Sequence, residues 1–161
     1  MKPLSDSDLA CFQRAVQLAL LAEEQGNLPI GAVIALEGKI IAEGKNAIWV
    51  PRFNQNRHAE IEVLRNVPDK LWKSAREMTL YTTLEPCLMC LGAILLHQVG
   101  RVLYGSADPY GGAGLVHGHL PAYFEGAASR MEWIGPAFTS ECDRLYERVM
   151  QKVDHQRDQG G

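Results

Sequence analysis

The chain has 161 residues, which is enough for one domain with its own hydrophobic core. Hydrophobic residues make up 47% and charged residues 22% of it, and no apolar run approaches membrane-spanning length, so we expect neither a disordered chain nor a membrane partner. The formal net charge of -3 carries no overall signature of nucleic-acid binding, although it leaves room for a local basic patch.

The N-terminal residues "MKPLSDSDLA" contain no apolar segment of the kind found in secretory signals, so a cytoplasmic location is expected. In a reducing compartment a chain of this length needs no disulfides. Cys11 and Cys142 lie in apolar stretches and are interpreted as small buried residues. Cys87 and Cys90 call for another explanation.

The first part of the chain is predicted to form one helix and a β-hairpin. Capping residues at 5–8 precede apolar residues at helical spacing, which predicts a helix of about 18–20 residues that closes near Gly26. The runs "IGAVIAL" (30–36) and "KIIAEG" (39–44) flank a Glu-Gly turn, which predicts a hairpin whose first strand is buried on both faces. Residues 45–57 are predicted to form a polar loop.

The rest of the chain alternates short helices and strands. The pattern predicts helices at 58–67, within 85–99 after a first-turn proline, and at 139–150, strands at 78–84, 101–105 and 131–135, and a functional loop at 106–121. This alternation predicts an α/β fold with one central sheet. We expect a single domain over 1–153 and a frayed tail at 154–161.

Cys87 and Cys90 follow a proline in "EPCLMC", at a spacing that places both side chains on one face of a helix. In the first helical turn, free N–H groups and the helix dipole favour the thiolate. Two converging thiolates suit zinc and leave two tetrahedral positions to be filled. His58, at another predicted helix start, is the natural third ligand, and the last position then stays open for water, as in catalytic sites.

Glu60 follows His58 by two residues, an offset that turns two side chains of a regular helix about 200° apart. The two side chains converge only if His58 lies where the helix begins. A carboxylate that lies beside a metal without binding it can take a proton from water and return it to a leaving group. We therefore predict that Glu60 carries a proton in the reaction.

Two other interpretations of these residues remain open. Cys11 or Cys142 is a possible remote fourth ligand, which would make a non-catalytic structural zinc module, although such a module has no use for the unbound carboxylate of Glu60. A Cys-x-x-Cys pair is also typical of thiol redox proteins, but that interpretation leaves "HAE" (58–60) unexplained.

The order H-x-E followed by P-C-x-x-C is the signature of zinc deaminases. This chain carries it as "HAE" (58–60) and "PCLMC" (86–90), each opening a predicted helix. With "LPIGAVIALEGKIIAEGKN" (28–46), "LYTTLEPCLMCLGAI" (80–94) and "GRVLYGSADPYGGAG" (100–114), most of residues 8–150 resembles the cytidine/deoxycytidylate deaminase superfamily. The closer likeness is to its purine branch, the tRNA adenosine deaminases and guanine deaminases.

The resemblance implies a three-layer α/β/α fold with a mixed five-stranded sheet, usually assembled as a homodimer. It implies that His58, Cys87 and Cys90 bind one zinc ion (Zn2+) per chain. It also implies that Glu60 shuttles a proton while a carbonyl replaces an exocyclic amine and ammonia leaves.

The resemblance further implies which residues contact the substrate. Asn46 corresponds to an asparagine that hydrogen-bonds the base, and the backbone amide of Ala59 would face the base edge. Asp108 and Tyr110 lie in the family-like loop and are further candidates. His117 and His119, later in the same loop region, are expected on a solvent-exposed turn.

The substrate is less clear from the residues. The purine branch typically has "DPTAHAE" where this chain has "NQNRHAE" (54–60), and the acidic pair typical of guanine enzymes is replaced at 115–117 by "LVH". "SADPYGGAG" (106–114) is similar to the tRNA enzymes, but the C-terminal residues 141–161 form no basic tract. We therefore predict deamination of a free nucleobase or nucleoside, preferably a purine, with a tRNA-specific adenosine deaminase acting at the anticodon wobble position as the alternative.

Overall fold

A five-stranded mixed sheet forms the centre of the molecule, in a computed structural model that describes residues 3–160 and the side chains of 3–156. The strands are β1 (Gly31–Leu36), β2 (Lys39–Lys45), β3 (Thr79–Leu84), β4 (Arg101–Ser106) and β5 (Glu132–Ile134), in the order β2-β1-β3-β4-β5. β1 runs antiparallel to β2 and β3, whereas β3, β4 and β5 are parallel. The predicted hairpin, its buried first strand and the edge position of β5 are all confirmed.

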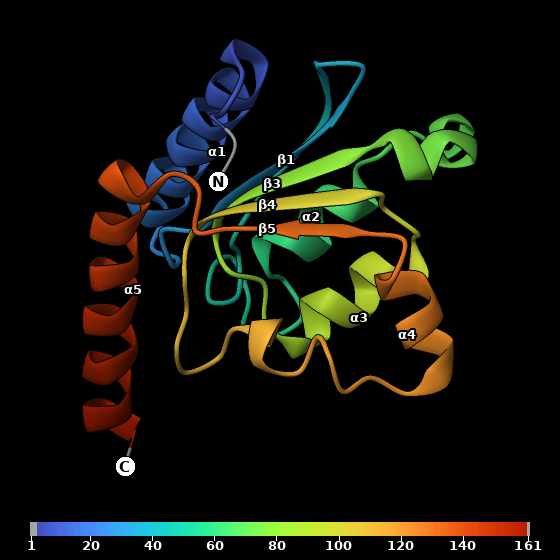
Figure 1. The fold of residues 1–161 in the computed structure, drawn as a ribbon. Coiled ribbons are helices and arrows are strands. Elements are labelled where there is room, and N and C mark those ends of the chain that lie inside the picture. Colours follow the sequence, from blue (N-terminus) through green and yellow to red (C-terminus); the bar gives the residue numbers. More distant parts are fainter. Residues whose placement is uncertain (1–2, 161) are drawn as a thin grey trace.

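Helices cover both faces of the sheet, which confirms the three-layer prediction (Figure 1). α1 (Asp6–Glu24) and α5 (Thr139–Gly160) lie on one side, and α2 (Ala59–Arg65), α3 (Leu88–Leu96) and α4 (Ala122–Ala128) on the other. The strand residues alternate accordingly. Val33, Tyr81 and Leu103 pack with the buried Phe12 of α1, while their neighbours Ile34, Leu80 and Val102 join the core beneath α2 and α3.

Several elements differ from the prediction. Short 3-10 helices occupy Asp69–Glu77 and Ala113–Leu115, and α4 lies in a range for which no element was predicted. α5 continues ten residues beyond its predicted end, so residues 154–160 of the expected frayed tail are helical. Val153 packs against the core and anchors α5 close to this extension.

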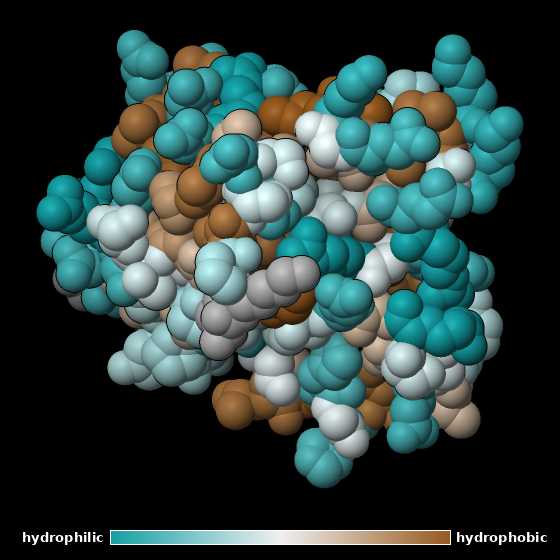
Figure 2. All heavy atoms as spheres, turned by 45° about the horizontal axis from the view of Figure 1, so that its top comes forward, coloured by the Kyte–Doolittle hydropathy of each residue, from teal (hydrophilic) through white to brown (hydrophobic). Residues whose placement is uncertain are grey.

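Figure 2 shows one face on which polar and charged side chains predominate and apolar side chains form separate patches. No helix within residues 3–160 combines the length and the apolar composition that a bilayer crossing requires.

α2 packs directly on β2 at Gly44. A Cβ atom added at Gly44 would overlap the backbone of Ala59 and Val63, so only glycine allows this close approach. We expect Gly44→Ala to lower the free energy of unfolding by about 1–3 kcal/mol, as overpacking of a core does, because α2 must move off the sheet. Urea unfolding measures this change.

Gly126→Ala is the matched control for this substitution. A Cβ atom at Gly126 in α4 would meet only the end of the Arg130 side chain, at 4.0 Å. Its free energy of unfolding should stay the same or rise, since alanine favours helix more than glycine does. Equal stability of the Gly44→Ala variant and the natural chain would contradict the close approach of α2.

Candidate functional site

Three potential metal ligands meet between α2 and α3. The Nδ1 atom of His58 lies 3.6 Å from Sγ of Cys87 and 3.6 Å from Sγ of Cys90, and the two sulfurs are 3.7 Å apart. A tetrahedral zinc site with ordinary bond lengths has edges of about 3.8 Å between two sulfurs and about 3.6 Å between sulfur and nitrogen. The three donor atoms therefore already have the spacing that zinc requires, and zinc binding by these residues stays a prediction.

Two helix starts create this convergence. His58 is the N-cap of α2 and Cys87 is the N-cap of α3, and both have extended backbone conformations rather than helical ones. The side chain of Cys90 returns to the same point from the first turn of α3. Pro86 precedes the N-cap and therefore lies outside the first turn of α3, where it was predicted. Local capping geometry thus directs both ligand segments toward one point.

Hydrogen bonding prepares the sulfurs for a cation. The hydrogen bond between the two sulfurs lowers the pKa of Cys87 to about 4, although burial acts in the opposite direction, and His58 reinforces the lowering. The same hydrogen bond, together with burial, raises the pKa of Cys90. Metal ligands must be deprotonated, so a divalent cation bound here would displace any thiol proton.

Glu60 lies beside these ligands and is buried, with 3% of its surface exposed. Its Oε1 accepts a hydrogen bond of 3.0 Å from the Thr82 hydroxyl on β3, and its Oε2 lies 3.5 Å from Sγ of Cys90. Burial raises the pKa of the Glu60 carboxyl, while the charge of His58 opposes that rise. Glu60 and His58 lie in the same group, as expected, because His58 lies at the N-cap rather than inside the helix.

Asn46 and Ala59 lie in the same region and are both buried. The Oδ1 atom of Asn46 accepts a hydrogen bond of 3.3 Å from the amide of Ile48. Its Nδ2 group is buried and has no partner among the described residues. A buried donor without a partner is costly and is typical of groups that bind a ligand. Ala59 is the first residue of α2, where the backbone N–H has no partner within the helix.

Asp108 and Tyr110 have different environments in the loop after β4. Oδ1 of Asp108 accepts hydrogen bonds from the amides of Tyr110 and Gly111, both at 3.0 Å, and from the hydroxyl of Tyr146 in α5 at 3.3 Å. Asp108 therefore shapes the loop and ties it to α5. The side chain of Tyr110 is 84% exposed. A substrate contact for either residue stays a prediction.

His117, Cys11 and Cys142 lie outside the ligand group. His117 packs on the ring of Trp133, with the ring centres 5.5 Å apart and Nε2 buried, which contradicts the expected solvent-exposed turn. His119 is exposed, as expected. Cys11 and Cys142 are buried in the core, as predicted, and Cys142 packs against Gly105. Neither joins the ligand group in the described part of the chain, so nothing there closes the site.

Glu85 is a site residue that the sequence interpretation missed. Its two carboxylate oxygens accept hydrogen bonds from the amides of Asp108 and Gly114, each at 2.9 Å, and the amide of Ala113 donates to the carbonyl of Pro86 at 2.9 Å. A side chain on Gly112 or Gly114 would overlap this carboxylate. The sequence contains one signal for this role: Glu85 is a charged residue between an apolar strand and Pro86, and glycines follow later in the loop.

Glu85→Gln tests this clamp. An amide side chain keeps one acceptor but turns an NH2 group toward the second backbone donor, which should cost about 1–3 kcal/mol of stability. We also expect faster hydrogen exchange at the amides of Asp108 and Gly114, measured by mass spectrometry. Glu125→Gln, at an exposed position of α4, should change neither quantity. Unchanged exchange in the Glu85→Gln variant would show that the carboxylate does not hold the loop.

Comparison with known proteins gives a consistent set of similarities. The sequence pattern of the MafB19-like deaminase family matches residues 6–132. A tRNA-specific adenosine deaminase of Bacillus subtilis (strain 168) is 42% identical over 106 residues, covering 63% of this chain and 63% of the relative. One of Haemophilus influenzae is 39% identical over 114 residues, covering 70% of this chain and 65% of the relative. These matches thus span less than two thirds of both relatives.

Solved structures extend the similarity to the fold. A structure from a study of A-to-I editing by tRNA:A34 deaminases at the wobble position is 36% identical, covers 71% of this chain and 90% of its own, and has a TM-score of 0.64. A guanine deaminase from Nitrosomonas europaea has a TM-score of 0.67 with 20% identity, covering 92% of this chain and 87% of its own, and supports the fold alone.

Proposed function

The chain belongs to the MafB19-like deaminase family, and from this membership we propose that it is a zinc-dependent hydrolase that converts adenosine to inosine in transfer RNA. The observation that carries the deaminase assignment is the zinc-matched spacing of His58, Cys87 and Cys90 beside the buried carboxylate of Glu60. The membership also confirms the predicted superfamily. One zinc ion per chain is part of this proposal.

The relatives favour one of the two predicted substrate classes. Those named above are tRNA-specific adenosine deaminases, at 39–42% identity, whereas the guanine deaminase structure is only 20% identical. We therefore place the tRNA alternative, with the wobble adenosine as target, ahead of the free nucleobase or nucleoside that the charge pattern favoured. Activity on the whole tRNA belongs to the proposal, since the matched region is shorter than the relatives.

The proposed reaction adds water to the amine-bearing carbon of adenine and releases ammonia. A zinc ion held by the three ligands would supply Lewis acidity that favours ionisation of water. Glu60 takes a proton from that water and delivers it to the departing amine nitrogen, which leaves as ammonia. The Thr82 hydroxyl holds one carboxylate oxygen and leaves the other directed toward the ligand group. Since Glu60 takes up one proton and releases it again, its carboxylate is ionised both before and after the reaction.

Asn46 and Ala59 are proposed to orient the base. The Nδ2 group of Asn46 is a buried donor that would gain a partner when a ring nitrogen or ribose oxygen binds. The free backbone N–H expected for Ala59 at the start of α2 can donate in the same region. Because both groups are fixed before binding, they select orientation with little loss of entropy.

A homodimer is also part of the proposal. The outer face of α3 exposes Leu88, Met89 and Leu96, with 62%, 38% and 56% of their surfaces accessible. Leu115 and Tyr123, in neighbouring segments, are also exposed. An apolar surface of this kind on a monomer typically marks an interface. A single species of 17.8 kDa in sedimentation equilibrium would contradict the dimer.

The substrate is tested by offering two classes to the zinc-loaded protein. One is an anticodon stem-loop with adenosine at the wobble position, and the other is a panel of guanine, adenine, cytosine and their nucleosides. Inosine in the stem-loop, detected by mass spectrometry and absent with the Glu60→Gln variant, is the expected result. Ammonia release from the small molecules alone would overturn the tRNA proposal and restore the free-nucleobase alternative.

A further inference from the structure

A polar hollow of about 410 Å³ lies next to the candidate active site. Its lining consists only of polar and charged side chains, namely Arg52, Asn54, Arg57, Glu62, Arg65 and Asn66. Three arginines against one carboxylate give it a formal charge of +2, on a chain whose net charge is -3. The hollow is therefore a local basic site on an acidic protein.

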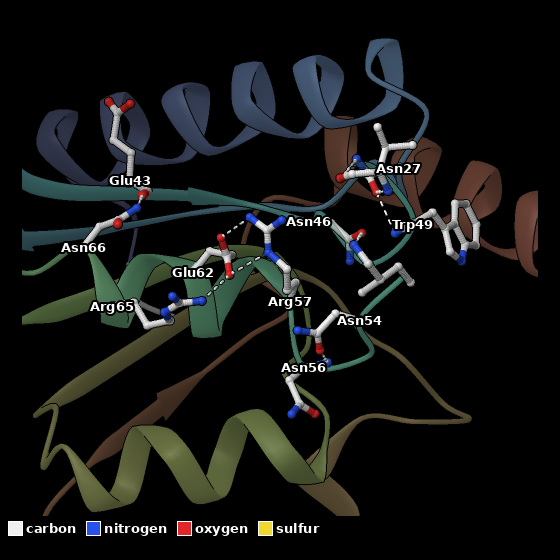
Figure 3. A network of polar contacts seen from close by, with 12 residues as sticks. Asn27, Glu43, Asn46, Trp49, Asn54, Asn56, Arg57, Glu62, Arg65 and Asn66 are labelled. Carbon is white, nitrogen blue, oxygen red and sulfur yellow. Dashed lines mark hydrogen bonds and ion pairs between the residues drawn. The ribbon is translucent and has the colours of Figure 1, made fainter. Parts of the chain in front are cut away.

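Glu62 holds two of the arginines in place. Nη2 of Arg57 donates to Oε2 of Glu62 at 2.8 Å and Nε donates to Oε1 at 3.3 Å, while Nη1 of Arg65 donates to Oε1 at 3.3 Å. Figure 3 shows both guanidinium groups directed toward this carboxylate. The Glu62 side chain is only 16% exposed, whereas that of Arg65 is 68% exposed. One carboxylate thus orients two cations and leaves donors of Arg65 facing solvent.

Arg52 takes no part in the Glu62 network. Its side chain is exposed and forms no hydrogen bond or ion pair with the residues that the structure describes. Arg52 is therefore available to an anion from outside the chain.

The hollow is connected directly to the site. Arg57 immediately precedes His58, and its carbonyl accepts a hydrogen bond of 3.0 Å from the amide of Ala47, next to Asn46. Asn54, which lines the hollow, donates its amide to the carbonyl of Ile48 at 2.8 Å. Figure 3 shows Asn46, Asn54 and Arg57 close together on this folded loop. One loop therefore carries a proposed base contact and half of the residues that line the hollow.

We infer that this hollow binds a backbone phosphate of the RNA strand that carries the target adenosine. Guanidinium groups match the geometry of phosphate oxygens, and phosphate contacts set the register of a strand without reading its sequence. A phosphate held here would position the adjoining nucleotide near Asn46. The inference rests on the proposed function, because a free nucleobase has no phosphate to place in the hollow.

The test measures binding of a labelled anticodon stem-loop to the zinc-loaded full chain by fluorescence anisotropy at several salt concentrations. Arg52→Gln with Arg65→Gln should weaken binding about tenfold, and the slope of log affinity against log salt should become shallower by about 0.7 for one lost phosphate contact. Arg52→Gln alone should move both quantities in the same direction. Because Arg52 is exposed, its replacement should leave the fold intact, which an unchanged melting temperature would verify.

Lys39→Gln is the control for a lost positive charge, because Lys39 is exposed at the start of β2, beside the Glu37–Gly38 hairpin turn. It should leave affinity and salt slope unchanged. Equal affinity and slope in the double arginine variant and the natural chain, with inosine still formed, would overturn this inference and leave the proposed function standing. Failure of the natural chain to bind or deaminate the stem-loop would overturn both. Inorganic phosphate and a nucleoside monophosphate can be added as competitors. If both weaken stem-loop binding equally, the hollow is a site for free anions, and the inference is overturned.

Discussion

Replacing Glu60 by glutamine is expected to lower kcat for deamination by about 10²–10⁴-fold without loss of zinc, the range for removal of a general acid-base group. Glutamine has nearly the same shape as glutamate and can still accept the hydrogen bond from Thr82. It cannot take a proton from water and return it to the amine. The measurement is single-turnover inosine formation in the stem-loop, with zinc content determined on the same sample.

The control for this variant is Glu24→Gln, at the exposed end of α1. It removes the same charge far from the ligands and should keep full activity. If the Glu60→Gln variant retained more than about a tenth of kcat with its zinc intact, the carboxylate would not carry the proton. Loss of zinc from that variant would instead show that Glu60 is itself a ligand.

Cys87→Ala should remove both the metal and the activity. Two protein ligands remain after this change, and metal affinity falls steeply when a three-ligand site loses a thiolate. We expect zinc to fall from one per chain to almost none and deamination to become undetectable. A chelator should lower the melting temperature of the natural chain but not that of the variant, since bound metal stabilises the folded state.

Cys142→Ala separates this effect from general damage to the core. Cys142 is buried against Gly105, outside the ligand group, so its loss should cost stability but keep one zinc per chain. Full zinc binding by the Cys87→Ala variant would contradict the proposed ligand set. It would also reopen the interpretation of Cys87 and Cys90 as a redox pair.

The convergence of His58, Cys87 and Cys90 was predictable because their geometry is local. A histidine and a cysteine at helix starts, with a second cysteine three residues on, fix the direction of each side chain through capping and helical periodicity. The hairpin was predictable for the same reason, since a Glu-Gly turn flanked by β-branched residues leaves few alternatives.

Residues whose roles depend on distant contacts were not predictable. Glu85 acts on amides 23 and 29 positions away, and Thr82 reaches Glu60 across 22 positions. α4 was missed because "AYFEGAA" (122–128) is short and has no clear apolar period. In each case the environment comes from packing that sequence spacing does not encode.

The predicted preference for a free nucleobase or nucleoside over tRNA, which was derived partly from charge, shows a different limit of sequence-based prediction. Net charge sums over the whole surface, whereas an RNA strand meets only the part of the surface that it touches. The chain is acidic overall, yet Arg52, Arg57 and Arg65 gather around a single hollow. The absence of a basic tract in the C-terminal sequence therefore said little about RNA binding.

X-ray absorption at the zinc edge tests the central claim most directly. A site made by His58, Cys87 and Cys90 predicts two sulfur neighbours at about 2.3 Å and two nitrogen or oxygen neighbours at about 2.0–2.1 Å, one of which exchanges when a nucleoside inhibitor binds. A spectrum with three or four sulfur neighbours, or a zinc-reconstituted sample without bound metal, would contradict a catalytic zinc site with one position open to water.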